Sequence, residues 1–195
     1  MDARPAGAES AVSDPSRSPA TPRPASIRLL PTKTGWKPFS TATRGAIGRA
    51  QRYIYIENLY LFDKRVIVAL GRARNRGVDL RVILPRVNDF KTGGRSNLVL
   101  ANYFLEHAGR LHFCPGMTHV KALLVDDWAC LGSGNLNHLS LRLCHEHNLA
   151  TSDPASRSSL KRDLFGVDFA CSYELTKLIT LGWSDLLTDL TLEGQ

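Results

Sequence analysis

The sequence predicts an α/β fold, a layered, mixed and mostly parallel β-sheet flanked by helices. Two observations lead to this prediction. From about residue 42 onward, segments with apolar residues at helical spacing alternate with short runs of β-branched and aromatic residues, as in layered α/β domains. The chain has 195 residues, 43% hydrophobic and 22% charged, which suits one full globular domain.

The beginning of the chain differs in composition from the rest. Seven of the ten prolines lie in the first 38 residues, and no aromatic residue precedes Trp36. Such a segment buries too little apolar area to offset the entropy lost on ordering. We therefore expect a disordered tail rich in Pro, Ala and Ser over residues 1–40 and a single domain over residues 41–195.

Turn and cap residues divide the domain into elements. Asp63 suits a helix N-cap, and Gly77 suits a helix end. The expected order is helix Thr43–Arg52, strand Tyr53–Leu59, helix Asp63–Gly77, strand Val78–Leu84, helix Ser96–Ala108, strands Leu111–Cys114, His119–Asp126, Ala129–Asn135 and His145–Thr151, and a helix that starts at Asp153–Pro154.

The net charge of +7 is unevenly distributed. Residues 1–44 hold seven Lys or Arg and three Asp or Glu, whereas residues 45–195 hold eighteen and fifteen. A basic tail adds loose affinity for phosphates or anionic membranes, but it does not make the domain a nucleic-acid reader.

Cysteine usage and hydropathy bear on the compartment. Cys114, Cys130, Cys144 and Cys171 lie far apart without a CxxC pair, which indicates reduced thiols. No apolar run approaches the roughly 18 residues that span a bilayer, and the start has no signal-peptide layout. We expect a cytoplasmic protein, with peripheral attachment to a membrane as a variant of this location.

The most informative segment for function is His119–Asn135 (HVKALLVDDWACLGSGN), which predicts a β-hairpin. A three-residue loop, 126–128, would place Lys121 opposite Ser133 and His119 opposite Asn135. The four polar side chains would then share one face. Asp126 falls off that face, which favours a structural role.

An imidazole, an ammonium, a hydroxyl and an amide on one patch suit a tetrahedral phosphate. The imidazole can attack phosphorus while Lys121, Ser133 and Asn135 hold the non-bridging oxygens. Glu146 could accept the Nδ1–H of His119 and leave Nε2 free as the nucleophile.

The motif H-x-K-x4-D followed by G-S-x-N resembles the HKD signature of the phospholipase D superfamily. It comprises His119, Lys121, Asp126, Gly132, Ser133 and Asn135, and Glu146 matches the family's downstream acidic residue. The stretches YIYIENLYL, RNRGVDLRVILP and LRLCHEHNL resemble the C-terminal half of bacterial cardiolipin synthases and related phospholipases. The similarity covers about residues 45–180.

Two features depart from the family pattern. Five residues instead of six separate Asp126 from Gly132, and H-x-K occurs only once, whereas the family's active site uses two such motifs. The resemblance therefore implies a second motif in trans, from a homodimer as in small single-motif nucleases of the superfamily or from another HKD-bearing subunit.

The resemblance implies a phosphodiesterase or phosphatidyltransferase that acts on glycerophospholipids at a membrane surface, through a phosphohistidine on His119 and without metal or other cofactor. A homodimeric nuclease, with nucleic acid as partner, and an inactive half-enzyme are the alternatives.

Other polar residues allow ordinary structural explanations. Glu57 and Asn58 end a strand, and the arginines at 72, 74 and 76 suit a solvated helix face. Cys144–His147 resembles a metal cluster only superficially, because His145 and His147 would face away from Glu146 on a strand.

Overall fold

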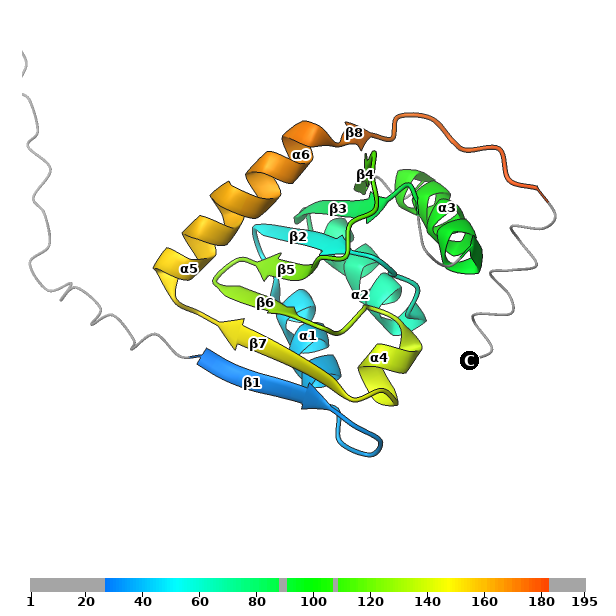
Figure 1. The fold of residues 1–195 in the computed structure, drawn as a ribbon. Helices are drawn as coiled ribbons and strands as arrows, with labels where there is room; N and C mark the ends of the chain where they lie inside the picture. Colours follow the sequence, from blue (N-terminus) through cyan, green and yellow to red (C-terminus); the bar gives the residue numbers. More distant parts are fainter. Residues whose placement is uncertain (1–26, 88–90, 107–108, 183–195) are drawn as a thin grey trace, which may run out of the picture.

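The computed structural model describes residues 27–87, 91–106 and 109–182, and only the backbone of residues 91–96. This part of the chain forms one eight-stranded sheet with helices on both faces (Figure 1). The strands are β1 Ile27–Thr32, β2 Tyr53–Asn58, β3 Asp79–Pro85, β4 Arg110–Cys114, β5 Lys121–Val125, β6 Trp128–Gly132, β7 Glu146–Thr151 and β8 Tyr173–Glu174. The helices are α1 Pro38–Arg49, α2 Lys64–Asn75, α3 Lys91–Glu106, α4 His138–Arg142, α5 Pro154–Ser159 and α6 Val167–Cys171, and a π-helical segment, Leu160–Gly166, joins α5 to α6.

The strand order is β1-β7-β6-β5-β2-β3-β4-β8. Among the described strands, β2–β3 and β3–β4 pair in parallel, and the other five pairings are antiparallel. The α/β class and the mixed sheet flanked by helices are thus confirmed, but the expectation of a mostly parallel sheet is wrong. The physical reason is the meander after β4, where connections as short as the two residues between β5 and β6 allow only antiparallel neighbours.

Local signals fix the helix ends on one face of the sheet. The Asp63 carboxylate accepts the backbone N–H groups of Arg65 and Val66 at 3.0 and 3.1 Å, which caps α2 as predicted. Gly77 follows that helix with φ 90°, where a residue without Cβ is favoured. Helix α1 starts at Pro38, five residues before the expected Thr43, because proline at the first turn lacks only an N–H that would be unpaired.

The N-terminal boundary differs from the expectation. Residues 27–32 form β1, which pairs antiparallel with β7 and buries Leu30 and Thr32. The expected tail of residues 1–40 therefore extends too far, since residues 27–40 already contain a strand and the start of α1. Residues 1–26 lie outside the described part of the chain.

Two apolar clusters occupy the two faces of the sheet. The larger one packs β2, β3 and β5 against α1, α2 and α3, and the smaller one gathers Tyr55, Leu124 and Phe165 beneath the π-helical segment. The helical segment that covers this second face does not extend to the β1 edge of the sheet. On that face Leu29, Leu149 and Leu131 lie opposite one another across β1, β7 and β6 and remain 57, 51 and 42% exposed. None of the described helices is long and apolar enough to cross a bilayer.

Candidate active site at the open end of the β5–β6 hairpin

The hairpin that carries the HKD-like motif has a register different from the expected one. Val125 pairs with Trp128, so the loop is the two residues Asp126 and Asp127 instead of three. The predicted three-residue loop over 126–128 is therefore wrong. A shift of one residue moves every following side chain of β6 to the other face of the sheet.

The four polar side chains therefore do not form the two expected cross-strand pairs. Lys121 begins β5 and β6 ends at Gly132, so His119, Ser133 and Asn135 lie just beyond the strand ends. The structure groups them differently. It brings His119 together with Lys121, and Ser133 together with Glu146.

His119 is exposed, and the side chain of Lys121 lies beneath it. Lys121 is 8% exposed, and its ammonium donates to the His119 carbonyl at 2.9 Å and to the ring Nδ1 at 3.2 Å. An ammonium has no acceptor, so Nδ1 must accept, and a neutral ring then carries its proton on Nε2. The accessible nitrogen of His119 is thus set up as a proton donor in the isolated chain.

A second contact holds the segment around His119 from the other face of the sheet. The Thr118 hydroxyl donates to Glu57 Oε1 at 2.7 Å and accepts the Val120 N–H at 3.3 Å. Glu57 is only 2% exposed, and its Oε2 has no hydrogen-bond partner within the described residues. The residues on both sides of the histidine are therefore tied to the end of β2.

Burial makes Glu57 a weaker acid than an ordinary glutamate. Desolvation, and to a smaller extent the Asp168 carboxyl on α6, raise the pKa of Glu57 to about 7, although the Thr118 hydrogen bond acts in the opposite direction. His112 lies on the same face, and neither of its ring nitrogens has a hydrogen-bond partner among the residues that the structure describes; burial lowers its pKa. The motif pattern gave no signal for this cluster, because it lies one residue before the H-x-K motif and on two other strands.

Ser133 and Glu146 form the second pair. The Ser133 hydroxyl donates to a Glu146 carboxylate oxygen and accepts the His147 N–H at 3.0 Å. Within the described part of the chain no hydrogen bond or ion pair joins Glu146 to His119. The expectation that this carboxylate fixes the His119 tautomer is therefore not met inside one chain.

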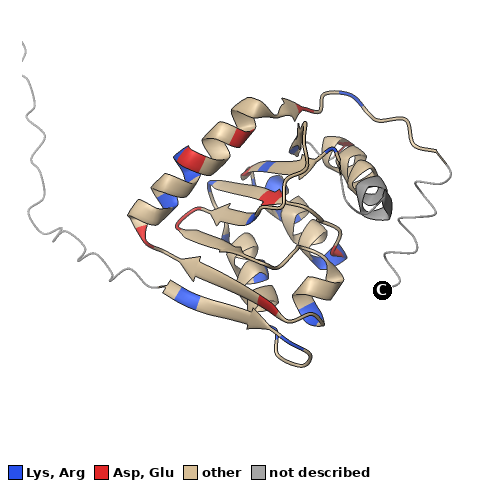
Figure 2. Ribbon diagram, in the orientation of Figure 1, with Lys and Arg blue, Asp and Glu red and all other residues tan. Residues whose placement is uncertain are grey.

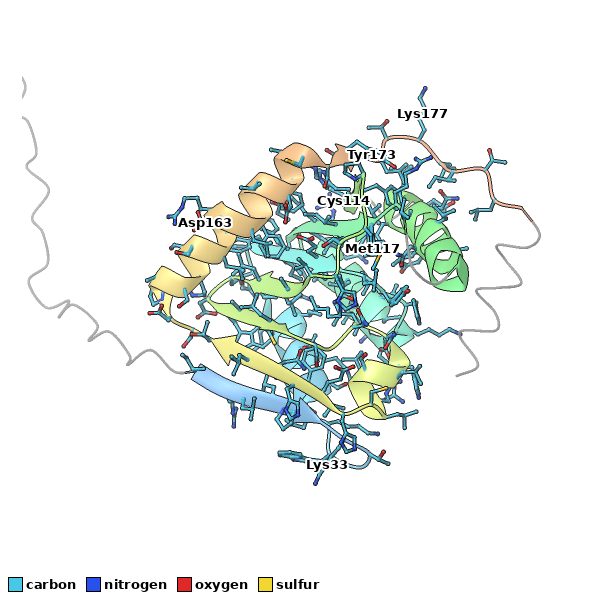
Figure 3. All side chains as sticks on the ribbon, viewed as in Figure 1. Lys33, Cys114, Met117, Asp163, Tyr173 and Lys177 are labelled. Atoms are coloured by element: carbon cyan, nitrogen blue, oxygen red, sulfur yellow. The ribbon has the colours of Figure 1, made fainter. Side chains whose placement is uncertain are left out.

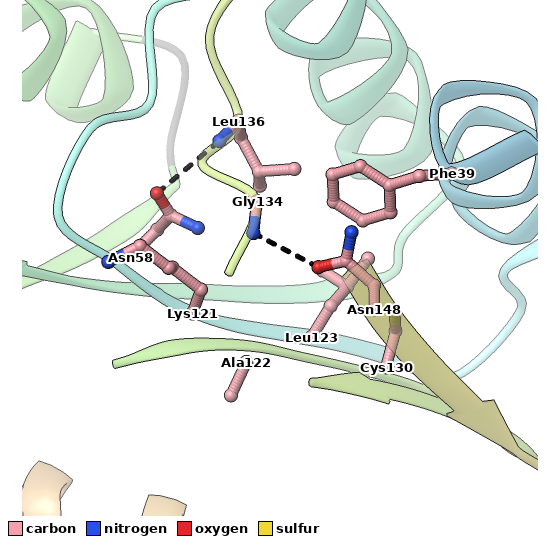
Figure 4. Close-up of a pocket in the computed structure, with 9 residues that line it drawn as sticks. All are labelled: Phe39, Asn58, Lys121, Ala122, Leu123, Cys130, Gly134, Leu136 and Asn148. Atoms are coloured by element: carbon pink, nitrogen blue, oxygen red, sulfur yellow. Dashed lines mark hydrogen bonds between the residues drawn. The ribbon is translucent and has the colours of Figure 1, made fainter. Parts of the chain in front are cut away.

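Beside Lys121 lies a small, mainly apolar cavity, lined among others by Phe39, Leu123, Asn58 and Asn148 (Figure 4). Its volume is about 10 Å³, room for one water molecule at most. A substrate must therefore bind on the open surface above it, beside the exposed His119. Asn58 and Lys121 pair directly across β2 and β5, whereas the preceding Glu57 faces the opposite side.

The GSG stretch packs too closely for larger residues. A Cβ on Gly132 would lie 2.4 Å from the His147 carbonyl, and one on Gly134 would lie 2.6 Å from the Phe39 ring. Asn148, which is 2% exposed, accepts the Gly134 N–H at 3.1 Å and thereby holds this loop in place. Asn148 and Phe39 were not predicted from the sequence, and only the position of Asn148, two residues after Glu146, could have indicated that residue.

Asp126 lies at the other end of the hairpin. Its carboxylate accepts the backbone N–H groups of Gln51, Arg52 and Tyr53 at 2.7, 3.0 and 2.9 Å. Burial acts to raise the pKa of Asp126, but these donors and Arg52 outweigh it and lower the pKa. Asp126 also adopts φ 47°, a left-handed conformation that aspartate tolerates in tight turns.

All four cysteines are free thiols, and in the described ranges no three His, Cys, Asp or Glu side chains gather as metal ligands. The loop from Cys114 to His119 contains Met117, which is half exposed (Figure 3).

Comparison with known proteins places the chain among the phospholipase D-like domains. The family model described as "Cardiolipin synthase, PLD-like domain" matches residues 44–165. The chain belongs to this family.

Individual relatives agree with this assignment. Cardiolipin synthase A of Pseudomonas entomophila is 34% identical over 134 residues, which are 67% of this chain and 28% of the relative. Cardiolipin synthase B of Salmonella typhi is 34% identical over 125 residues, 61% of this chain and 30% of the relative. The chain thus spans less than a third of the length of these curated relatives.

Solved structures share the fold at low sequence identity. The phospholipase D family member Nuc from Salmonella typhimurium superposes with TM-score 0.67 at 18% identity, covering 78% of this chain and 99% of Nuc. Phosphatidylserine synthase from Haemophilus influenzae superposes with TM-score 0.68 at 17% identity, covering 89% of this chain and 46% of that protein.

Proposed function

We propose that this protein is a phosphodiesterase or phosphatidyltransferase that acts on glycerophospholipids through a covalent phosphohistidine on His119. The observation that carries the proposal is the exposed His119 ring held by the buried Lys121 ammonium, within a domain of the cardiolipin synthase family. An exposed nucleophile on a fixed cation suits an anionic diester, whose negative charge the cation attracts.

The proposed reaction has two displacements. The imidazole nitrogen of one His119 attacks phosphorus, the bond from phosphorus to the headgroup oxygen breaks, and a second histidine gives its proton to that oxygen. The second histidine then takes the proton of water, or of an alcohol such as a glycerol headgroup. The new oxygen–phosphorus bond forms as the nitrogen–phosphorus bond breaks. Lys121, Ser133 and Asn135 bind the non-bridging oxygens.

A second copy of this chain would supply the second histidine. Each chain has one H-x-K motif, and its own Lys121 holds His119 with the proton on Nε2, the form that a general acid needs. One of two identical rings must then lose or move that proton to become the nucleophile. Glu146, which does not reach His119 within its own chain, could supply this difference across a two-fold axis.

The exposed leucines of the sheet support this arrangement. Leu29, Leu149 and Leu131 form an apolar row, and Ser133 continues β6 from Leu131 to the site. Apolar surface of this kind marks interaction sites, and this row is continuous with the incomplete active site.

The test is turnover of phosphatidylglycerol vesicles by the full chain, with phosphatidic acid and cardiolipin measured separately. We expect the wild type to release one or both products and His119→Asn to release neither. The control variant Leu178→Ser, which changes an exposed residue after β8, should behave like the wild type. Cleavage of DNA without lipid turnover would instead establish the nuclease alternative. Absence of turnover on both substrates by a folded dimer would indicate an inactive half-enzyme.

A further inference from the structure

The near balance of charge in the domain conceals a strongly basic layer. Helices α1 and α2 together contain six Lys or Arg and no Asp or Glu. Figure 2 shows these cations along the two helices. The acid that flanks α2, its N-cap Asp63, is buried and pairs with Arg142 at 2.7 Å. The outer side of this layer therefore has a positive field that no acidic residue of either helix offsets.

The two helices enclose an open groove of about 520 Å³. Arg44 and Gly48 of α1 line it on one side, and Arg65, Val68 and Arg72 of α2 line it on the other. Gly48 leaves open space, because a Cβ there would meet no atom within 4 Å. At the far end Arg76 donates to the carbonyls of Ile47 and Ala50, which closes α1 onto α2.

Three of the groove's cations are available to a partner. Arg44, Arg65 and Arg72 are exposed, and within the described residues their guanidinium groups make no ion pair and no hydrogen bond. Guanidinium groups bind phosphate in a bidentate way. An array of three unpaired ones along a groove is thus suited to several phosphates held at a surface.

We infer that the groove between α1 and α2 docks the protein on a membrane that contains anionic phospholipids. The inference rests on the proposed function, and it names the surface by which that enzyme meets its substrate. Val68, 47% exposed among the arginines, adds apolar contact. None of the residues that line the groove is aromatic, whereas single-stranded nucleic acid is usually held by aromatic stacking.

One end of the groove lies toward the candidate active site. Phe39, in the first turn of α1, lines the cavity beside Lys121, and the N-cap of α2 follows the loop in which Leu61 bridges to Leu136. Both helices therefore start at the edge of the sheet that holds His119. A membrane against the groove would present lipid headgroups at that edge.

The experiment is co-sedimentation of the full chain with vesicles of phosphatidylcholine alone or of phosphatidylcholine and phosphatidylglycerol in equal amounts. We expect binding only to the anionic vesicles, weakening as salt is raised. Arg65→Gln with Arg72→Gln should reduce partition about 30-fold, from two lost surface cations. Glutamine is a good helix former, so the melting temperature should hold.

A matched control removes the same charge elsewhere. Arg162→Gln with Lys177→Gln changes two exposed cations outside the groove, and Lys177 points away from the domain (Figure 3). This pair should leave partition close to the wild-type value. In a third variant, Gly48→Glu places a carboxylate in the open part of the groove and should weaken binding without removing any arginine.

Two results would overturn the inference. Equal losses in the groove and control pairs would show that net charge, not the groove, drives binding. Retained vesicle binding with lost binding to a DNA duplex in the groove pair would identify a nucleic-acid surface. Vesicle binding is measured without turnover, so the proposed enzyme activity can fail while this surface stands. Conversely, turnover of a soluble short-chain diester should be unchanged in the groove variants.

Discussion

The two ends of the β5–β6 hairpin use residues of one motif for different purposes. At the open end, His119 is exposed and contacts the buried ammonium of Lys121. At the turn end, Asp126 faces three backbone N–H groups of the segment before β2. A strand five residues long thus separates a candidate nucleophile from a carboxylate that joins the hairpin to its neighbour. Proximity in a sequence motif does not place residues in one site.

The largest effect is expected at the open end. His119→Asn should lower phosphodiester turnover at least about 10³-fold, because it removes the group that forms the covalent intermediate. The free energy of unfolding should stay near the wild-type value, since the ring is exposed. Steady-state kinetics with denaturant unfolding of the same preparation checks both statements. A variant that keeps its turnover would place the chemistry elsewhere.

The next effect concerns the buried acid behind the histidine. Glu57 has a pKa raised to about 7 in the folded protein, above the ordinary value of 4.5. The folded state therefore binds its proton more tightly than the unfolded state. The stability this proton provides is fully present below about pH 4.5 and is lost as the pH rises through about 7.

Glu57→Gln keeps an acceptor for Thr118 and carries no charge. At about pH 8 this variant should be more stable than the wild type by about 3 kcal/mol, whereas at about pH 4.5 the two should be similar. His112 contributes an opposite slope, because its lowered pKa favours folding as the pH rises through the unfolded value of 6.5. The difference between variant and wild type cancels that contribution. If the unfolding free energies of the two proteins differed by the same amount at every pH, this would contradict a raised pKa of Glu57.

A substitution at the turn end of the hairpin should lower the free energy of unfolding. Asp126→Asn removes the negative charge and at least one of three backbone hydrogen bonds, which should cost about 2 kcal/mol of unfolding free energy. Turnover per folded molecule should remain near the wild-type value. Thermal unfolding and activity measured side by side provide the check. Loss of turnover at an unchanged melting temperature would assign Asp126 to the chemistry and remove the contrast between the two ends.

The smallest effect is expected for Ser133→Ala. Its hydroxyl contacts Glu146 in the free protein, so it must exchange one partner for another when phosphate binds. The net loss in kcat/KM should be about tenfold. A Ser133→Thr variant, which restores the hydroxyl, should recover part of it. Unchanged kinetics in the alanine variant would leave phosphate binding to Lys121 and Asn135.

Much of the fold could be predicted from local sequence signals. The predictions that failed concern features that depend on contacts between residues far apart in the sequence. Asp63 and Gly77 bound α2 through short-range hydrogen bonding and backbone freedom, so they were recognisable. Strand β1 was missed because its partner β7 lies more than a hundred residues later, and its proline-containing sequence resembles the tail before it.

The site was predicted in composition but not in arrangement. His119 and Lys121 meet as neighbours two apart, which requires no knowledge of the register. The predicted position of Ser133 depended on the length of the hairpin loop. The structure has a two-residue turn that begins at Asp126, where three loop residues were expected. Glu57 and Asn148 reach the site from β2 and β7, and only the sheet order brings those strands next to the hairpin.

The proposed active site needs His119 from two copies, and subunit mixing separates this arrangement from one in which each chain works alone. Wild type and His119→Asn are combined in equal amounts, allowed to exchange, and assayed for phosphodiester turnover. Mixed dimers lack one histidine, so activity should fall to about a quarter of that of the same total amount of wild type. Activity of about one half would mean that each chain works alone and would contradict the shared site.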